Sequence, residues 1–108
     1  MKSDKWVVKY TESYKEDLLS IYDYISDVIL EPEIAEKLTN RIHAAADSLD
    51  FMPLRYQLIA HEPWRSMGWR IMPVENYLVF YVPCESSGMV EVMRVIYSGR
   101  KIEEHLDS

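Results

Sequence analysis

The chain has 108 residues, the length of one domain, and 48% of them are hydrophobic, which excludes a disordered protein. We therefore expect a single domain over residues 1–108. The formal net charge of −6 argues against a protein whose whole surface binds nucleic acid. The single cysteine, Cys84, excludes an intrachain disulfide, and no apolar run approaches 18 residues. We expect a cytoplasmic protein with no membrane partner.

The charges are unevenly distributed along the chain. Residues 11–50 contain ten Asp and Glu but three Lys and Arg, whereas residues 55–101 contain six Lys and Arg and four Glu. An anionic ligand is therefore expected on the C-terminal half.

Residues 5–10 (KWVVKY) are rich in β-formers and predict a first strand. Thr11 and Ser13 are then candidate N-caps of a helix, and Ser13 with Glu16 fits a capping box. The helix of about four turns is indicated by apolar residues spaced three and four apart, namely Tyr14, Leu18, Ile21, Tyr22, Ile25, Val28 and Ile29.

Pro32 suits the first turn of a second helix, because its missing N–H is not needed there. The apolar stripe of that helix consists of Ile34, Ala35, Leu38, Ile42, Ala45, Ala46 and Leu49. Since only a few residues separate the two helices, we expect them to pack as an antiparallel hairpin. Pro53 ends the second helix, and an irregular connection follows, with a short extended piece at Gln57–Ala60.

Three strands are predicted in the last third of the chain, at Trp69–Val74, Tyr77–Val82 and Met89–Tyr97. Their connections are too short for parallel crossovers, so they should form an antiparallel meander. The middle strand is apolar on both faces, as is typical of a central strand covered on each side. We expect an α+β fold, with an N-terminal strand and the antiparallel two-helix hairpin packed on one face of an antiparallel sheet of about four strands.

Five segments resemble, in order and spacing, motifs of the RelE/ParE superfamily of bacterial toxins. They are Asp17–Ile25 (DLLSIYDYI), Phe51–Pro53 (FMP), Gly68–Arg70 (GWR), Glu75–Tyr81 (ENYLVFY) and Val92–Lys101 (VMRVIYSGRK). The resemblance covers nearly the whole chain. It implies the toxin of a type II toxin–antitoxin system, neutralised by a cognate antitoxin protein and needing neither a cofactor nor a metal ion.

Members of this superfamily differ in their target. RelE-like members cut mRNA, often on the ribosome, and ParE-like members inhibit DNA gyrase. Our first hypothesis is a metal-free mRNA endoribonuclease, or mRNA interferase. The alternatives are a non-enzymatic gyrase inhibitor and a degenerate member that binds only its antitoxin. Cleavage by the ribose 2′-hydroxyl needs a base, an acid and cations for the phosphorane charge.

The candidate catalytic residues are Arg70, Arg100, Tyr97 and His61. Arg70 matches the Gly-aromatic-Arg motif of the superfamily, although it could instead pair with a carboxylate such as Glu75 or Glu91. Arg100 matches part of a basic pair near the C-terminus. Tyr97 stands where many relatives have His; it could stack on a base, but its ordinary pKa near 10 makes it a poor proton acceptor.

The candidate residues for binding RNA or another target are Arg65, Lys101, Arg94 and Trp64. Arg94 interrupts an apolar strand, and pairing with an acidic residue of the helices is the favoured interpretation for it.

His61 and Arg65 lie where relatives that act on the ribosome have lysines, and this chain has no lysine between Lys37 and Lys101. That difference weakens the nuclease hypothesis and favours the ParE-like branch. His43 and His105 are weaker candidates, and the three histidines lack the spacing of metal ligands. We expect no catalytic role for Cys84, since its sequence neighbours suggest no activating group.

Overall fold

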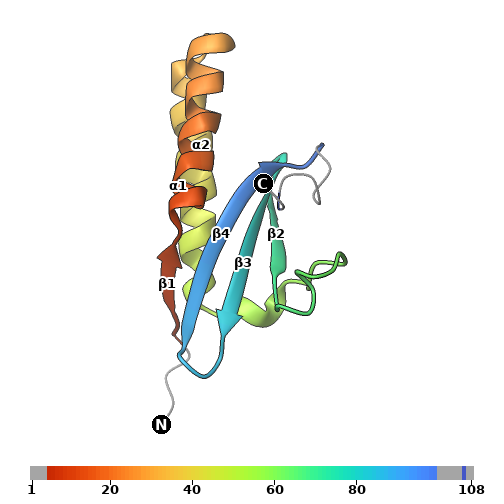
Figure 1. Cartoon of the computed structure of the whole chain (residues 1–108). Helices are drawn as coiled ribbons and strands as arrows, with labels where there is room; N and C mark the ends of the chain where they lie inside the picture. Colours follow the sequence, from red (N-terminus) through yellow and green to blue (C-terminus); the bar gives the residue numbers. More distant parts are fainter. Residues whose placement is uncertain (1–4, 100–105, 107–108) are drawn as a thin grey trace.

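The structure, a computed structural model, describes residues 5–99 and residue 106. Its elements are β1 (Val7–Tyr10), α1 (Glu12–Asp23), a π-helical continuation (Tyr24–Val28), α2 (Pro32–Asp47), 3-10 turns (Ser48–Asp50 and Pro53–Arg55), β2 (Arg70–Val74), β3 (Tyr77–Cys84) and β4 (Met89–Tyr97). Both helices lie on one face of the sheet, and the hairpin extends well past the end of the sheet (Figure 1). The predicted α+β architecture is confirmed.

The start of α1 is fixed by Thr11, whose Oγ1 accepts a hydrogen bond from the Tyr14 N–H at 3.1 Å. The same hydroxyl donates to the Met93 carbonyl of β4 at 2.8 Å. One side chain therefore caps the helix and attaches it to the sheet. At the other end of the hairpin, Leu30 has φ of 66° in the connection, and Pro32 is the first residue of α2, as predicted.

The sheet has the strand order β1-β4-β3-β2. The predicted antiparallel meander is confirmed for β2, β3 and β4. However, β1 pairs with β4 in parallel, with Val7 opposite Met89 and Tyr10 opposite Val92, so the sheet is mixed. The prediction of an antiparallel sheet is wrong for this one pair. The direction of β1 relative to β4 depends on the path that the chain takes through the helical hairpin to the meander. No local sequence pattern in β1 encodes that path.

Two hydrophobic cores cover the two faces of the sheet. The core under the helices contains Tyr14, Ile42, Ala46, Leu49, Met72, Val74, Val79, Tyr81, Val90, Val92 and Val95. The core on the opposite face contains Ile59, Trp64, Trp69, Phe80 and Ile96, with Leu106 packed against it. Val79 and Phe80, adjacent on β3, are both fully buried in different cores. This confirms that β3 is a central strand covered on both faces.

The outer edge of β2 is closed to a further strand. The Ile71 N–H points away from β3 and donates to the Gln57 carbonyl at 3.1 Å, and the Ile59 N–H donates to the Trp69 carbonyl at 2.9 Å. The next outward position on β2 is Pro73, which has no N–H to offer. A partner peptide therefore cannot extend the sheet along β2 by regular backbone pairing.

Candidate functional site

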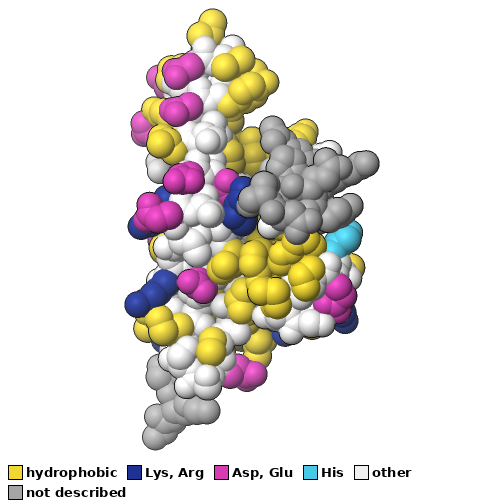
Figure 2. Space-filling view, in the orientation of Figure 1, with side chains coloured by type: hydrophobic (Ala, Val, Ile, Leu, Met, Phe, Trp, Pro, Cys, Tyr) yellow, Lys and Arg dark blue, Asp and Glu magenta, His cyan; other side chains and the backbone are white. Residues whose placement is uncertain are grey.

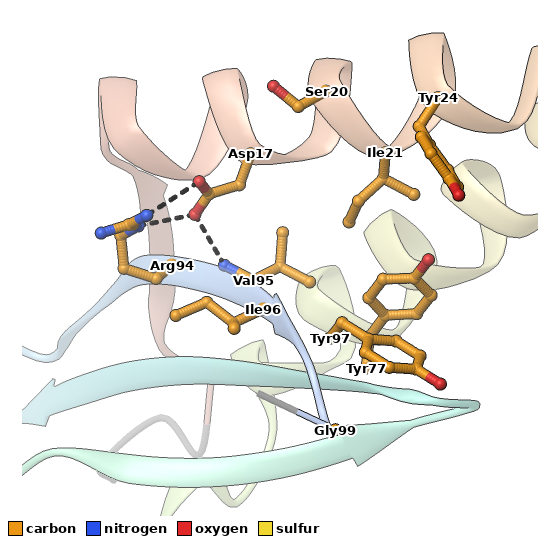
Figure 3. Close-up of a pocket in the computed structure, with 10 residues that line it drawn as sticks. All are labelled: Asp17, Ser20, Ile21, Tyr24, Tyr77, Arg94, Val95, Ile96, Tyr97 and Gly99. Atoms are coloured by element: carbon orange, nitrogen blue, oxygen red, sulfur yellow. Dashed lines mark hydrogen bonds and ion pairs between the residues drawn. The ribbon is translucent and has the colours of Figure 1, made fainter. Parts of the chain in front are cut away.

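A cavity of about 800 Å³ lies between α1 and the ends of β3 and β4. We call it the tyrosine cleft; it is lined by Asp17, Ser20, Ile21, Tyr24, Tyr77, Arg94, Val95, Ile96, Tyr97 and Gly99. Tyr24 points from the helix toward Tyr77 and Tyr97 on the strands (Figure 3). Figure 3 shows α1 above β4 at this cleft, and the hairpin continues past the end of the sheet (Figure 1).

The register of the sheet places Tyr77 and Tyr97 together. Val74, Tyr77 and Tyr97 form one row across β2, β3 and β4 at the end of the sheet. The two tyrosine rings meet edge to face, with centroids 5.6 Å apart and planes at 69°. Tyr24 and Tyr97 are 56% and 48% exposed, so both rings are open to a ligand.

The charges in the tyrosine cleft compensate each other. The Arg94 guanidinium donates to both carboxylate oxygens of Asp17, with Nε–Oδ2 at 2.6 Å and Nη2–Oδ1 at 3.0 Å. The Val95 N–H also donates to Asp17 Oδ2 at 3.1 Å. Hydrogen bonding to Asp17 raises the pKa of Arg94. The favoured interpretation of Arg94, internal pairing with an acidic helix residue, is confirmed, and its charge is compensated within the protein.

Arg70 lies far from the tyrosine cleft. It is opposite Tyr81 on β3, four residues along β2 from the row that contains Tyr97, or roughly 13 Å. Its Nη1 donates to the Tyr56 carbonyl at 2.5 Å and to the Leu54 carbonyl at 3.3 Å. The guanidinium therefore holds the connection that follows α2.

The carboxylates suggested as partners of Arg70 lie elsewhere. Glu75 forms an ion pair with Arg41 of α2 at 3.0 Å. Glu91 is opposite Lys9 and Val82 in the sheet, away from β2. From the sequence, a carboxylate partner was the alternative to a catalytic role for Arg70. The guanidinium instead contacts backbone carbonyls.

The segment that carries His61, Trp64 and Arg65 lies on the sheet face opposite the helices. Trp64 is 7% exposed and belongs to the second core, so little of its ring is available for stacking. Arg65 Nη1 donates to the Ile59 carbonyl at 3.4 Å, and His61 is exposed beside it. These residues and the tyrosine cleft are therefore on opposite faces of the sheet.

Arg100, Lys101 and His105 lie outside the described residues. Arg100 follows Gly99, which lines the tyrosine cleft, directly in the sequence. Tyr97 and Arg94 are the candidates that the structure brings together in this cleft.

Sequence reasoning missed two kinds of residue. Tyr77 was predicted within a strand that is apolar on both faces, and Tyr24 was not assigned to the apolar stripe of the first helix, yet both line the same cavity. Cys84 was expected to lack an activating neighbour, but its Sγ lies 3.3 Å from Ser86 Oγ. Hydrogen bonds to Ser86 and Ser87 lower the pKa of the exposed thiol to about 7. The sequence Cys84-Glu85-Ser86-Ser87 in a turn was the available signal.

The described residues show neither a metal-binding cluster nor a membrane-spanning helix. Among them, no group of three or more His, Cys, Asp or Glu side chains is arranged to hold a metal ion. No helix within the described part of the chain is long and apolar enough to cross a membrane.

Comparison with known families gives a match over residues 8–102 to the model of the ParE toxin of the type II toxin–antitoxin system parDE. The chain belongs to this family. It is the toxin of a type II toxin–antitoxin system, with an antitoxin as its partner. A search of the curated proteins gives no match.

Solved structures confirm the fold. The chromosomal ParDE toxin–antitoxin system from P. aeruginosa matches with a TM-score of 0.71 and 21% identity, over 88% of this chain and 98% of that one. The RelBE2 toxin–antitoxin complex from Mycobacterium tuberculosis matches with a TM-score of 0.61 and 20% identity, over 89% and 94%. The isolated E. coli RelE toxin matches with a TM-score of 0.50 and 10% identity, over 94% of each chain. The toxin therefore has the RelE/ParE fold.

Proposed function

We propose that this toxin arrests growth by binding DNA gyrase, without chemistry of its own, and that it does not cleave mRNA. The observation that carries the proposal is the separation of the candidate catalytic residues. Arg70 is roughly 13 Å along the sheet from the row of Tyr97 and two strands away. Cleavage of one phosphodiester requires its base, acid and cation within hydrogen-bond reach of the same few atoms.

The chemistry of the individual side chains supports the same conclusion. The Arg94 guanidinium is compensated by Asp17, and Arg70 donates to backbone carbonyls. Neither presents an uncommitted cation for a phosphorane. Tyrosine is in general a poor base at neutral pH.

The tyrosine cleft is the surface we assign to target binding. Its volume of about 800 Å³ is large enough to take several side chains of a protein partner. Tyrosine is enriched among the residues that dominate protein–protein affinity, because its ring buries a large area and loses little conformational entropy. Tyr24, Tyr77 and Tyr97 come from the π-helical continuation, β3 and β4, and all three line the cleft (Figure 3).

The experiment compares two activities of one toxin preparation. We expect the purified toxin to inhibit DNA supercoiling by gyrase and to leave mRNA intact, both free and on translating ribosomes. Tyr97→Ala should weaken gyrase inhibition about tenfold or more, as expected for an interface residue of this kind. Phe51→Ala is the matched control, because Phe51 is 51% exposed and is bridged to Lys5, near the first residue of β4, whereas Tyr97 is the last residue of that strand.

Two results would contradict the proposal. Cleaved mRNA with normal supercoiling would establish the nuclease hypothesis, and loss of cleavage in Arg100→Ala would then place the chemistry near the C-terminus. Equal inhibition by the Tyr97 and Phe51 variants would remove the tyrosine cleft from the interface while leaving gyrase as the target.

A further inference from the structure

The far end of the helical hairpin, where the chain turns from the first helix into the second, carries an exposed apolar surface. We call it the hairpin tip; it consists of Val28, Ile29, Leu30 and Ile34, which are 63%, 50%, 72% and 52% exposed. The hairpin continues past the end of the sheet (Figure 1), and Figure 2 shows hydrophobic side chains gathered at its end. Single apolar residues are common on protein surfaces, but a contiguous patch of them marks an interaction site.

Burial within the chain does not account for the apolar residues of the hairpin tip. Ile34 belongs to the apolar stripe that the sequence predicts for the second helix. Further along that stripe Ile42, Ala46 and Leu49 are fully buried in the core, whereas Ile34 is exposed. The apolar pattern of the hairpin thus extends beyond the part of it that the core uses.

Leu30 is also poorly suited to its own backbone. Its φ of 66° lies in the left-handed region. After a helix that position is usually glycine, because a Cβ is crowded there. Leu30 is in addition the most exposed of the four residues of the tip. Neither backbone conformation nor burial therefore favours a leucine at this position.

The hairpin tip is continuous with the tyrosine cleft. The π-helical continuation begins at Tyr24, which lines the cleft, and ends at Val28, the first residue of the tip. The Ile29 N–H donates to the Tyr24 carbonyl at 3.1 Å, which links the two surfaces through one turn of backbone. Turns of π-helix are rare and are frequently found at functional sites. One partner surface can therefore cover the cleft and the tip together.

The charge around the hairpin tip selects among possible partners. From Asp23 to Glu36 the chain has five Asp and Glu and no Lys or Arg, and Lys37 follows. All five acidic residues are exposed. A second copy of the chain would bring like charges together, and nucleic acid or an anionic membrane would be repelled. The tip therefore suits a protein surface that is apolar at its centre and basic around it.

We infer that the hairpin tip inserts into an apolar pocket of DNA gyrase that is bordered by Lys and Arg side chains. Gyrase has the required charge, because proteins that act on DNA carry Lys and Arg where they face its phosphates. Leu30 fills the pocket, and the carboxylates of Asp27 and Glu31 face the cations. The inference rests on the proposed function and extends the contact made by the tyrosine cleft.

Leu30→Gly separates binding from folding. Glycine removes the apolar side chain and suits the left-handed backbone, so we expect an unchanged or higher melting temperature. Inhibition of supercoiling by the purified toxin should weaken at least about tenfold.

Met52→Gly is the matched control for this variant. Met52 has a φ of 49° and is 55% exposed, so the substitution changes the same kind of residue in the same backbone conformation. The 16 residues of α2, roughly 24 Å of helix, lie between Met52 and the hairpin tip. We expect this variant to inhibit supercoiling as strongly as the unmodified toxin.

A second pair of variants tests the charge of the pocket. Asp27→Asn with Glu31→Gln should weaken gyrase inhibition about three- to tenfold and reduce its dependence on salt. Glu85→Gln with Glu91→Gln, on exposed residues outside the hairpin, is the control and should change neither.

The outcomes distinguish a wrong site from a wrong target. Unmodified toxin that leaves supercoiling intact overturns both the proposed function and this inference. Equal inhibition by the unmodified toxin and by Leu30→Gly overturns the inference and keeps gyrase as the target. Loss of antitoxin binding or of toxin self-association in that variant then identifies the occupant of the tip.

Two further results also contradict the inference. A lower melting temperature of Leu30→Gly together with lost inhibition would assign Leu30 to the fold. Inhibition that depends on Leu30 but is unaffected by salt and by the carboxylate variants would exclude a basic pocket.

Discussion

Asp17 of α1 and Arg94 of β4 form a two-point ion pair that connects the helical hairpin to the sheet. The carboxylate accepts from both Nε and Nη2 of Arg94 and from the Val95 N–H. The side chains are only 17% and 22% exposed. The shift in register between Phe80 and Tyr81, which leaves Met93 as an additional residue in β4, immediately precedes this contact. A single acidic residue thus compensates a charge and satisfies a strand N–H.

Removing the carboxylate should destabilise the fold. We expect Asp17→Ala to lower the free energy of unfolding by about 2–4 kcal/mol, because it leaves a partly buried guanidinium and a strand N–H without their acceptor. Asp17→Asn keeps one acceptor oxygen and should cost less. Urea unfolding checks both, with Glu16→Ala as the exposed neighbour that changes stability by no more than about 0.5 kcal/mol. Equal values for Asp17→Ala and Glu16→Ala would refute a structural role for the pair.

Replacing Arg70 should affect stability more than toxicity. Its guanidinium donates to the carbonyls of Leu54 and Tyr56, and hydrogen bonds from a charged donor contribute about 1.5–3 kcal/mol. We expect Arg70→Ala to lower the melting temperature by several degrees and to retain growth arrest at a temperature where the variant is folded. Normal melting together with lost toxicity would instead assign Arg70 to the target site, as the superfamily motif suggests.

The stability of the toxin should fall at alkaline pH because of two buried tyrosines. Burial raises the pKa of Tyr14 and of Tyr81 from 10.0 to about 12. Below pH 10 both phenols are protonated whether the chain is folded or unfolded. Between pH 10 and about 12 the unfolded chain loses these protons and the folded chain keeps them, so stability decreases as pH rises.

Chemical denaturation at a series of pH values measures this effect. Tyr14→Phe and Tyr81→Phe should each be less stable at neutral pH, since Tyr81 donates to the Pro53 carbonyl at 2.6 Å and Tyr14 contacts His43. Each variant should also show a shallower decrease above pH 10. A decrease as steep as that of the unmodified protein would contradict the assignment to these residues.

Cys84 should react with alkylating reagents at unusually low pH. Hydrogen bonds to Ser86 and Ser87 lower the pKa of its thiol from 9.0 to about 7, so about half is thiolate at neutral pH. We expect the iodoacetamide rate to reach half its maximum near pH 7 in the folded protein. Denatured protein should require a pH higher by about 2 units, near 9.0. If Ser86→Ala with Ser87→Ala leaves the midpoint unchanged, the hydroxyls are not its cause.

Much of the architecture follows from the sequence by itself. The two apolar stripes predict the helices, and Pro32 begins α2 as expected. The doubly apolar segment at Tyr77–Val82 predicts a central strand, and the five motifs predict the toxin fold. These patterns are local, since a helix or strand must place apolar residues at its own period to bury one face. The order of the elements along the chain then limits the arrangements in which they can share one core.

Only the tertiary structure decided which side chains meet. Arg70 and Tyr97 both matched superfamily motifs, yet the register of β2, β3 and β4 separates them along the sheet. Tyr24, which no motif marked as functional, faces Tyr97 and its neighbour Tyr77 across one cleft. The parallel pairing of β1 with β4 was likewise hidden. Strand direction, register and the overhang of the hairpin arise from contacts between residues far apart in sequence. Local periodicity carries no information about which distant residues come into contact.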